Sequence, residues 1–143
     1  MKHWSWLIVG LFLLSGCATK AERNACSIIA SYQTPELEQN HFRLLVTAIN
    51  DKPVMSRPMY QLAPGKVTLQ LVELIDHPEL GVAPEQRHFE TMELDLKPNL
   101  RYHLVARFVA ANADGPGYWE PIVVETEVFN CSMEQPYVAQ PAQ

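Results

Sequence analysis

Histidines and carboxylates are the side chains best suited to acid–base or metal chemistry, and here they are scattered along the chain. The histidines that follow the apolar N-terminal segment are His41, His77, His88 and His103. A strand-borne His103 and a loop His88 could share a metal, but the spacing matches no zinc motif, and scattered surface histidines are the alternative. Four carboxylates, Asp76, Glu79, Glu85 and Glu90, lie in or beside one polar segment. Solvation is the ordinary role of charge there, so they do not indicate paired acid–base groups.

Motifs typical of enzymes are missing from the sequence. It contains no Gly-x-Ser-x-Gly, no His-Glu-x-x-His and no glycine-rich phosphate loop. We therefore expect no enzyme, no bound metal and no cofactor.

The first sixteen residues have the pattern of a secretory signal peptide. Lys2 and His3 precede the apolar run 4–14, which ends in small residues. A run of about eleven residues is too short to cross a bilayer as a helix, which needs about twenty. At its end, Leu14-Ser15-Gly16-Cys17 resembles the lipobox of bacterial lipoproteins. The alternative is an ordinary secreted protein with a coincidental cysteine.

The lipobox resemblance implies a membrane anchor. Lipoproteins of this kind are cut before the cysteine, so Cys17 would become the N-terminus, carrying lipid of the palmitate type on sulfur and usually a further acyl chain on nitrogen. Two or more acyl chains give stable anchoring, at about 0.8 kcal/mol per buried methylene. Ala18 follows the cysteine where Asp would retain a Gram-negative lipoprotein in the inner membrane. The expected location is the outer membrane, on the periplasmic side, with the inner membrane and the cell surface as alternatives.

If Cys17 carries lipid, Cys26 and Cys131 remain as an isolated pair. In an oxidising periplasm such a pair is most simply a disulfide, and closing a loop of about 105 residues stabilises by at most about 4 to 5 kcal/mol. A reactive thiol is the alternative, although no Cys-x-x-Cys motif supports it. The expected organisation is a signal peptide at 1–16, a lipidated tether at 17–25, one domain at 26–131 and a flexible tail at 132–143.

The size and charge of the mature chain limit its partners. About 127 residues remain after cleavage, which is one ordinary domain. Loss of Lys2 leaves ten basic against sixteen acidic residues. An acidic chain argues against binding nucleic acid and against an electrostatic hold on anionic lipid.

An alternation of period two dominates the residues between Cys26 and Cys131. In the stretch 101–108, Tyr102, Leu104, Ala106 and Phe108 share one face, and Arg101, His103 and Arg107 share the other. The same alternation or composition predicts strands at 26–32, 41–50, 54–62, 67–71, 92–96 and 122–129. Only 34–38 looks helical, and it is barely longer than a turn.

Turn residues separate these strands. Pro64-Gly65 and Pro98-Asn99 suit type II turns, and Asn50-Asp51 and residues 113–117 mark further reversals. The pattern predicts an all-β domain, a single antiparallel sandwich of about seven strands of immunoglobulin-like or transthyretin-like kind. The stretches 62–69, 101–104 and 119–122 are also similar to a pattern in small uncharacterised envelope lipoproteins with such domains.

The segment 76–88 (DHPELGVAPEQRH) is long for a connection in a tightly turned chain. Its Leu80 and Val82 suit an exposed apolar tip, although a long surface loop without a function explains the segment equally well. If the strands from residue 41 run up and down, this loop, Asn50-Asp51 and Asp114-Gly115 meet at one end, opposite the two proline turns. The candidate partner-binding residues at that end are Leu80, Val82, Tyr118 and Trp119. Burial in the sheet is the alternative for the two aromatic residues.

These observations together favour a lipid-anchored, periplasm-facing envelope protein without catalysis, which recognises or helps to assemble another envelope protein. Strand addition at an exposed sheet edge is a second mode of binding that the sequence permits. Two alternatives stay open. A carrier of a small apolar ligand, such as a lipid or a cell-wall fragment, would need a wide cavity between the sheets. A purely structural envelope protein would need no binding site.

Overall fold

The computed structural model describes residues 23–77, 80 and 87–135, and almost all of its regular structure is β-strand. The one 3₁₀ turn, η1 (Leu37–Gln39), overlaps the segment predicted to be helical. The strands are β1 (Ser27–Ala30), β2 (His41–Ile49), β3 (Lys52–Pro53), β4 (Met59–Leu62), β5 (Gly65–Leu74), β6 (Glu90–Leu96), β7 (Leu100–Val109) and β8 (Tyr118–Val128). Each predicted strand has a counterpart, but the segment 54–62 is extended in the sheet only over β4.

These strands form one open mixed sheet of eight strands, in the order β4-β1-β7-β2-β5-β6, with β3 added to β2 and β8 added to β7. β1 runs parallel to β7, whereas every other pair is antiparallel, so the expectation of a purely antiparallel arrangement is wrong. β1 is short and covers only the first half of the β7 edge. The start of β2 therefore pairs with the second half, through His41 and Phe42, before β2 turns to pair with β5.

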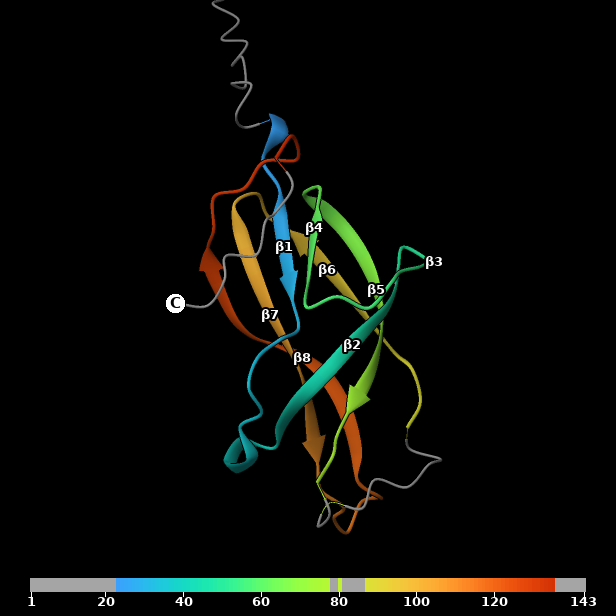
Figure 1. Ribbon diagram of the computed structural model, residues 1–143. Helices are drawn as coiled ribbons and strands as arrows, with labels where there is room; N and C mark the ends of the chain where they lie inside the picture. The colour runs from blue at the N-terminus through green and yellow to red at the C-terminus, as the bar shows by residue number, and fades with distance from the viewer. Residues whose placement is uncertain (1–22, 78–79, 81–86, 136–143) are drawn as a thin grey trace, which may run out of the picture.

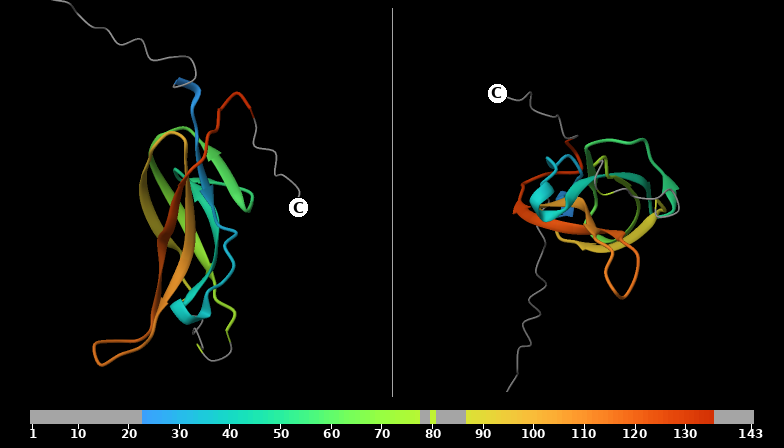
Figure 2. Two further views of the ribbon diagram at one scale, coloured as in Figure 1. Left: turned by 90° about the vertical axis from the view of Figure 1, so that its left-hand side faces the viewer. Right: turned by 90° about the horizontal axis from the view of Figure 1, so that it is seen from below.

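This change of partner along β2 curls the sheet around one core. Figure 1 shows β2 crossing diagonally between β7 and β5, and the view from below in Figure 2 shows the strands arranged around a ring. The inward positions of β5 and β7 are those that the alternation predicts, and the burial of β2 alternates in the same way. The core residues from these strands are Phe42, Leu44, Val46, Val67, Leu69, Leu71, Leu104, Ala106 and Phe108. Each fully buried leucine stabilises the fold by about 1.5 to 3 kcal/mol.

Left-handed backbone conformations occur at the predicted turns. Gly65, the first residue of β5, has φ 125°, and Asn99, between β6 and β7, has φ 58°. Asn50 and Asp51, with φ 49° and 62°, form the two-residue turn between β2 and β3. Glycine and asparagine tolerate positive φ better than other residues, which explains why these turns were readable.

The two proline turns lie at one end of the molecule, and the end of β5 and the connection 110–117 lie at the other (Figure 1). Asn50-Asp51 is not at this second end, contrary to the expectation. Its Asn50 N–H donates to the Thr68 carbonyl at 2.8 Å, only three residues from Gly65. The chain does not run strictly up and down because β2 and β4 point the same way, with β3 and residues 54–58 returning between them.

A disulfide joins Cys26 and Cys131, as predicted, at the end that holds the proline turns. The pairing continues past both cysteines. Ala25 and Ser132 form a bridge, and the Met133 N–H donates to the Asn24 carbonyl at 2.7 Å. Ser132 and Met133, which lie in the segment expected to be a flexible tail, are thus paired with the residues that precede Cys26. None of the described helices is long and apolar enough to span a membrane.

Candidate functional site

The outward face of the β7–β8 ribbon carries the most organised group of polar side chains in the described structure. Tyr102, Leu104 and Phe108 point into the core or pack against it, so the intervening residues of β7 point outward, as the alternation predicts. β8 pairs with β7 along its whole length, with a register shift between His103 and Leu104. The outward charged residues are Arg101, His103 and Arg107 on β7 and Glu120, Glu125 and Glu127 on β8. The basic side chains of β7 therefore lie beside the carboxylates of β8.

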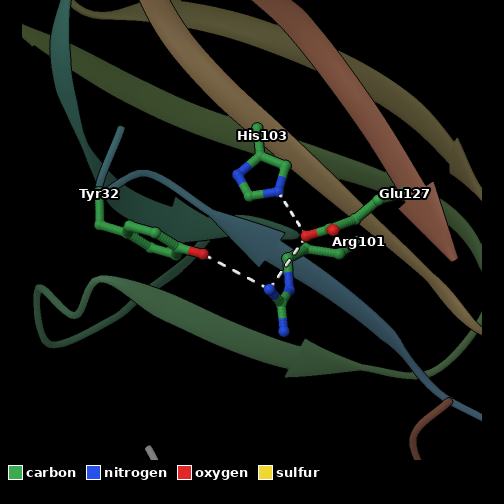
Figure 3. A network of polar contacts seen from close by, with 4 residues as sticks. All are labelled: Tyr32, Arg101, His103 and Glu127. Atoms are coloured by element: carbon green, nitrogen blue, oxygen red, sulfur yellow. Dashed lines mark hydrogen bonds and ion pairs between the residues drawn. The ribbon is translucent and has the colours of Figure 1, made fainter. Parts of the chain in front are cut away.

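One carboxylate oxygen organises the first of two charged groups on this face. Oε1 of Glu127 lies 3.0 Å from Arg101 Nη1 and 2.8 Å from His103 Nε2. The same Arg101 Nη1 donates to the Tyr32 hydroxyl at 3.4 Å, so the connection after β1 joins the group (Figure 3). The Arg101 guanidinium also lies 3.8 Å from the centroid of the Phe129 ring. These contacts hold the Arg101 side chain on both sides and fix its direction.

The charge state of this group follows from its contacts. The hydrogen bond from His103 is the largest influence on the pKa of Glu127 and lowers it below its ordinary value; burial opposes this shift, and the positive charge of Arg101 adds to it. His103 is almost fully buried, and its Nδ1 has no hydrogen-bond partner in the described structure. With only Nε2 bonded, the hydrogen is assigned to that nitrogen, which donates to the carboxylate. His103 is thus engaged by Glu127 and is not open to solvent.

The second charged group lies further along the same ribbon. Arg107 and Glu120 are cross-strand partners, and both Nε, at 2.9 Å, and Nη2 of Arg107 contact the same carboxylate oxygen. Val105 and Ile122, also cross-strand partners, lie between the two charged groups. The face therefore alternates charged and apolar layers along the strands.

A groove of about 570 Å³ lies beside this face. The segment after β1 and the start of β2 form one wall, which includes Glu36 and His41. Val105, Ile122, Val124 and Glu125 supply the other side. Its volume is that of a small-molecule pocket, but the groove is open and its lining mixes apolar and charged side chains, which suits a polypeptide side chain better.

The structure does not bring together the partner-binding residues proposed from the sequence. Trp119 is 1 % exposed and belongs to the core, so its assignment as a partner-binding residue is wrong. Leu80 also packs against the core instead of forming an exposed tip. Tyr118 is 49 % exposed at the start of β8, and Val82 lies outside the described residues. Inward positions of β8 take Trp119 because a large aromatic residue buries well in a curled sheet.

A buried carboxylate at the base of the 76–88 loop was not found by sequence reasoning. Glu73 occupies an inward position of β5 and is 3 % exposed. Its Oε2 accepts the Ile75 N–H, and its Oε1 lies 3.2 Å from Arg87 Nη1. Arg87 Nη2 donates to the Ile75 carbonyl at 3.1 Å. The available signal was the place of Glu73 in the apolar series Val67, Leu69, Leu71, where a charged residue needs a partner.

The histidines and carboxylates do not converge on a metal site in the part of the chain that is described. His88 contacts Glu90 at 2.6 Å, whereas His103 is held by Glu127. No group of three or more His, Cys, Asp or Glu residues suited to a metal ion is found among residues 23–77, 80 and 87–135. Glu79 and Glu85 lie outside those residues.

The outward β7–β8 face therefore emerges from geometry alone as the candidate site. Its charged groups are fixed by neighbours, and it adjoins an open groove lined by both charged and apolar side chains. No protein-family model, curated protein or solved structure matches the chain, so no relative supplies a role for these residues.

Proposed function

We propose that the mature chain is a lipid-anchored envelope protein, facing the periplasm from the outer membrane, that recognises another protein through the outward face of β7 and β8. We also assign the sheet to a sandwich of immunoglobulin-like or transthyretin-like kind. The support for that assignment is β2, which divides the sheet into two halves that share one core. The observation that carries the functional proposal is the pair of fixed charged groups on the β7–β8 face.

Charged side chains that are already fixed favour recognition, because binding a partner then costs little side-chain entropy. Arg101 is held between Glu127, Tyr32 and the Phe129 ring, so little side-chain entropy remains to be lost. Charges arranged in this way steer a complementary partner and set its register more than they add affinity. Val105 between them is buried, so the apolar contact area comes from the half-buried Ile122 and the exposed Val124.

The anchor limits how the domain lies on the membrane. Arg23, the first described residue, is six positions after Cys17, and a fully extended chain over six positions spans at most about 20 Å. The disulfide end of the domain would therefore stay close to the lipid surface, and the β7–β8 ribbon would extend away from it.

Two other roles receive less support. A carrier of an apolar ligand needs a cavity between the two halves of the sheet, but Ile29, Leu69, Leu71 and Leu104 are completely inaccessible. A side chain with no accessible surface lines no cavity that holds even a water molecule. An acid–base enzyme needs a group free to exchange protons with a substrate, whereas His103 and Glu127 are bonded to each other.

The anchor is tested by the intact mass of the protein from membranes of its own host, beside a Cys17→Ala variant. We expect a chain that begins at Cys17 with added acyl groups, and loss of both lipid and membrane association in the variant. An unlipidated soluble product would overturn the anchor.

Recognition is tested separately, by placing a photo-crosslinking amino acid at Val124 in the groove or at Glu93 on β6, both exposed. We expect one discrete adduct from Val124 in intact cells and none from Glu93. Equal adducts from both positions, or none from either, would overturn the proposed recognition face and favour a purely structural role.

A further inference from the structure

β8 is hydrogen-bonded along only one of its edges. It spans eleven residues, and its ladder partner is β7. β6 is the other end of the described sheet; some of its Cα atoms come within 8 Å of those of β8, but no ladder joins the two strands. No backbone hydrogen bond reaches the outer edge of β8 from any part of the chain that the structure describes. An open strand edge of this length is a template for another extended chain.

The usable part of this edge is Ile122–Val128. Pro121 lies within β8 opposite Ala106 and has no N–H to donate. A proline in a strand places its nitrogen on the unpaired side, so an added strand would lose one hydrogen bond at Pro121 but none beyond it. The far half is also the more exposed, since Val124 is 38 % and Val128 is 77 % exposed. Seven residues are enough for a strand of ordinary length.

The charges of β8 specify the chemistry of the occupant. β8 carries three glutamates and no lysine or arginine. Arg107 pairs with Glu120, and Arg101 with Glu127, but Glu125 has no hydrogen bond or ion pair within the described structure. Glu125 is exposed at the edge of the groove. A strand added beside β8 would therefore be stabilised by a basic side chain opposite Glu125.

The same charges disfavour a second copy of this chain. Antiparallel pairing of β8 with another β8 would bring glutamates from two strands together with no cation on either. Like charges on directly opposite residues destabilise a sheet.

We propose that the Ile122–Val128 edge of β8 binds an extended segment of a partner protein by strand addition, with a lysine or arginine of that segment paired to Glu125. This inference deepens the proposed function and rests on it. The partner segment resembles β7 in its chemistry, because β7 already meets the glutamates of β8 with cations separated by apolar residues. Pro121, the register shift and the glutamates also hinder pairing with unselected strands, so they add specificity at this edge.

The experiment uses the complete lipidated protein in a neutral detergent and a synthetic peptide with the sequence of residues 100–109. This peptide copies the strand that already complements β8. Binding is measured by fluorescence anisotropy at low salt, and hydrogen exchange identifies the amides that become protected. We expect slower exchange across residues 122–128 with β7 still protected, which shows addition to β8 and not displacement of β7.

Three matched comparisons isolate the contacts. Glu125→Lys removes one attraction and adds a repulsion, so it is expected to weaken binding about fivefold. Glu93→Lys makes the same exchange at an exposed position of β6 and should change nothing. A peptide methylated on alternate backbone nitrogens keeps its charges but cannot extend the ladder, and it should not bind.

The proposal is overturned if Glu125→Lys binds as well as the parent, if Glu93→Lys weakens binding equally, or if the methylated peptide binds. It is also overturned if sedimentation without peptide shows a dimer in which residues 122–128 are already protected from exchange, since the edge would then take a second copy. These results are separate from the test of the anchor. If the protein is lipidated but does not bind the peptide, only the proposal of strand addition at β8 is overturned. If it is unlipidated but binds the peptide, only the proposal of the lipid anchor is overturned.

Discussion

Replacing Arg87 by alanine removes the cation that faces the buried carboxylate of Glu73. The carboxylate would keep the Ile75 N–H as its hydrogen-bond donor, but its other oxygen would face the core without a counter-charge. Arg87 would also release the Ile75 carbonyl. The substitution therefore affects both sides of the loop base.

The size of the effect follows from how exposed each partner is. Removing one member of a fully buried ion pair costs about 3 to 5 kcal/mol. The Arg87 side chain is 45 % exposed, however, and its 3.2 Å contact with Glu73 is an ion pair without hydrogen-bond alignment. Solvent screening lowers the expected loss to about 2 kcal/mol of unfolding free energy.

A double-mutant cycle in urea, with the disulfide intact, separates the ion pair from the other contacts of Arg87. Glu73→Gln keeps an oxygen for the Ile75 N–H and removes the charge, so Arg87→Ala should then cost less than about 1 kcal/mol. If Arg87→Ala costs the same in the parent protein and in the Glu73→Gln variant, the two residues are not coupled and this account of the loop base is refuted.

Three further predictions test the site and the core. The pKa of Glu127 is lowered by His103 and Arg101, so its carboxylate stabilises the fold fully above its ordinary pKa, and this stability is lost as the pH falls from there through the lowered pKa of the folded state. The difference in urea stability between the parent and Glu127→Gln should therefore be larger at pH 6 than at pH 3, and a constant difference would contradict the ion pair. Trp119→Ala should cost about 3 to 5 kcal/mol of unfolding free energy because the side chain is buried, whereas Tyr118→Ala should cost under about 1 kcal/mol; similar losses would place Trp119 outside the core. Cys131→Ser should lower the unfolding free energy by about 2 to 5 kcal/mol, and an unchanged thermal midpoint would show that the bond contributes nothing to stability.

Local patterns predicted most of the strands and turns. The alternation in 101–108 identified both faces of β7, because inward side chains must be apolar and outward ones need not be. Pro64-Gly65 and Pro98-Asn99 marked turns because they supply fixed and positive φ angles at neighbouring positions. The lipobox at Leu14–Cys17 stays a prediction, since those residues lie outside the described structure.

Long-range pairing was not predictable in the same way. Nothing within the four residues of β1 indicates that they run parallel to β7, because both faces of β1 are buried and its sequence lacks alternation. The wrong placement of Asn50-Asp51 has the same origin, since a strand of two residues at β3 leaves almost no periodic signal. The charged groups of the candidate site depend on cross-strand register, which is set by the whole sheet.

The parallel pairing of β1 with β7 affects how the domain resists a pulling force. A pull on the N-terminal tether would act along β1, so its bonds to β7 and β4 would be loaded in shear and would have to break together. The Cys26–Cys131 bond lies before the first of these pairs and passes part of the same force to the segment that follows β8. Force applied at the N-terminal end of the domain would thus be divided between β1 and β8, the two strands on either side of β7.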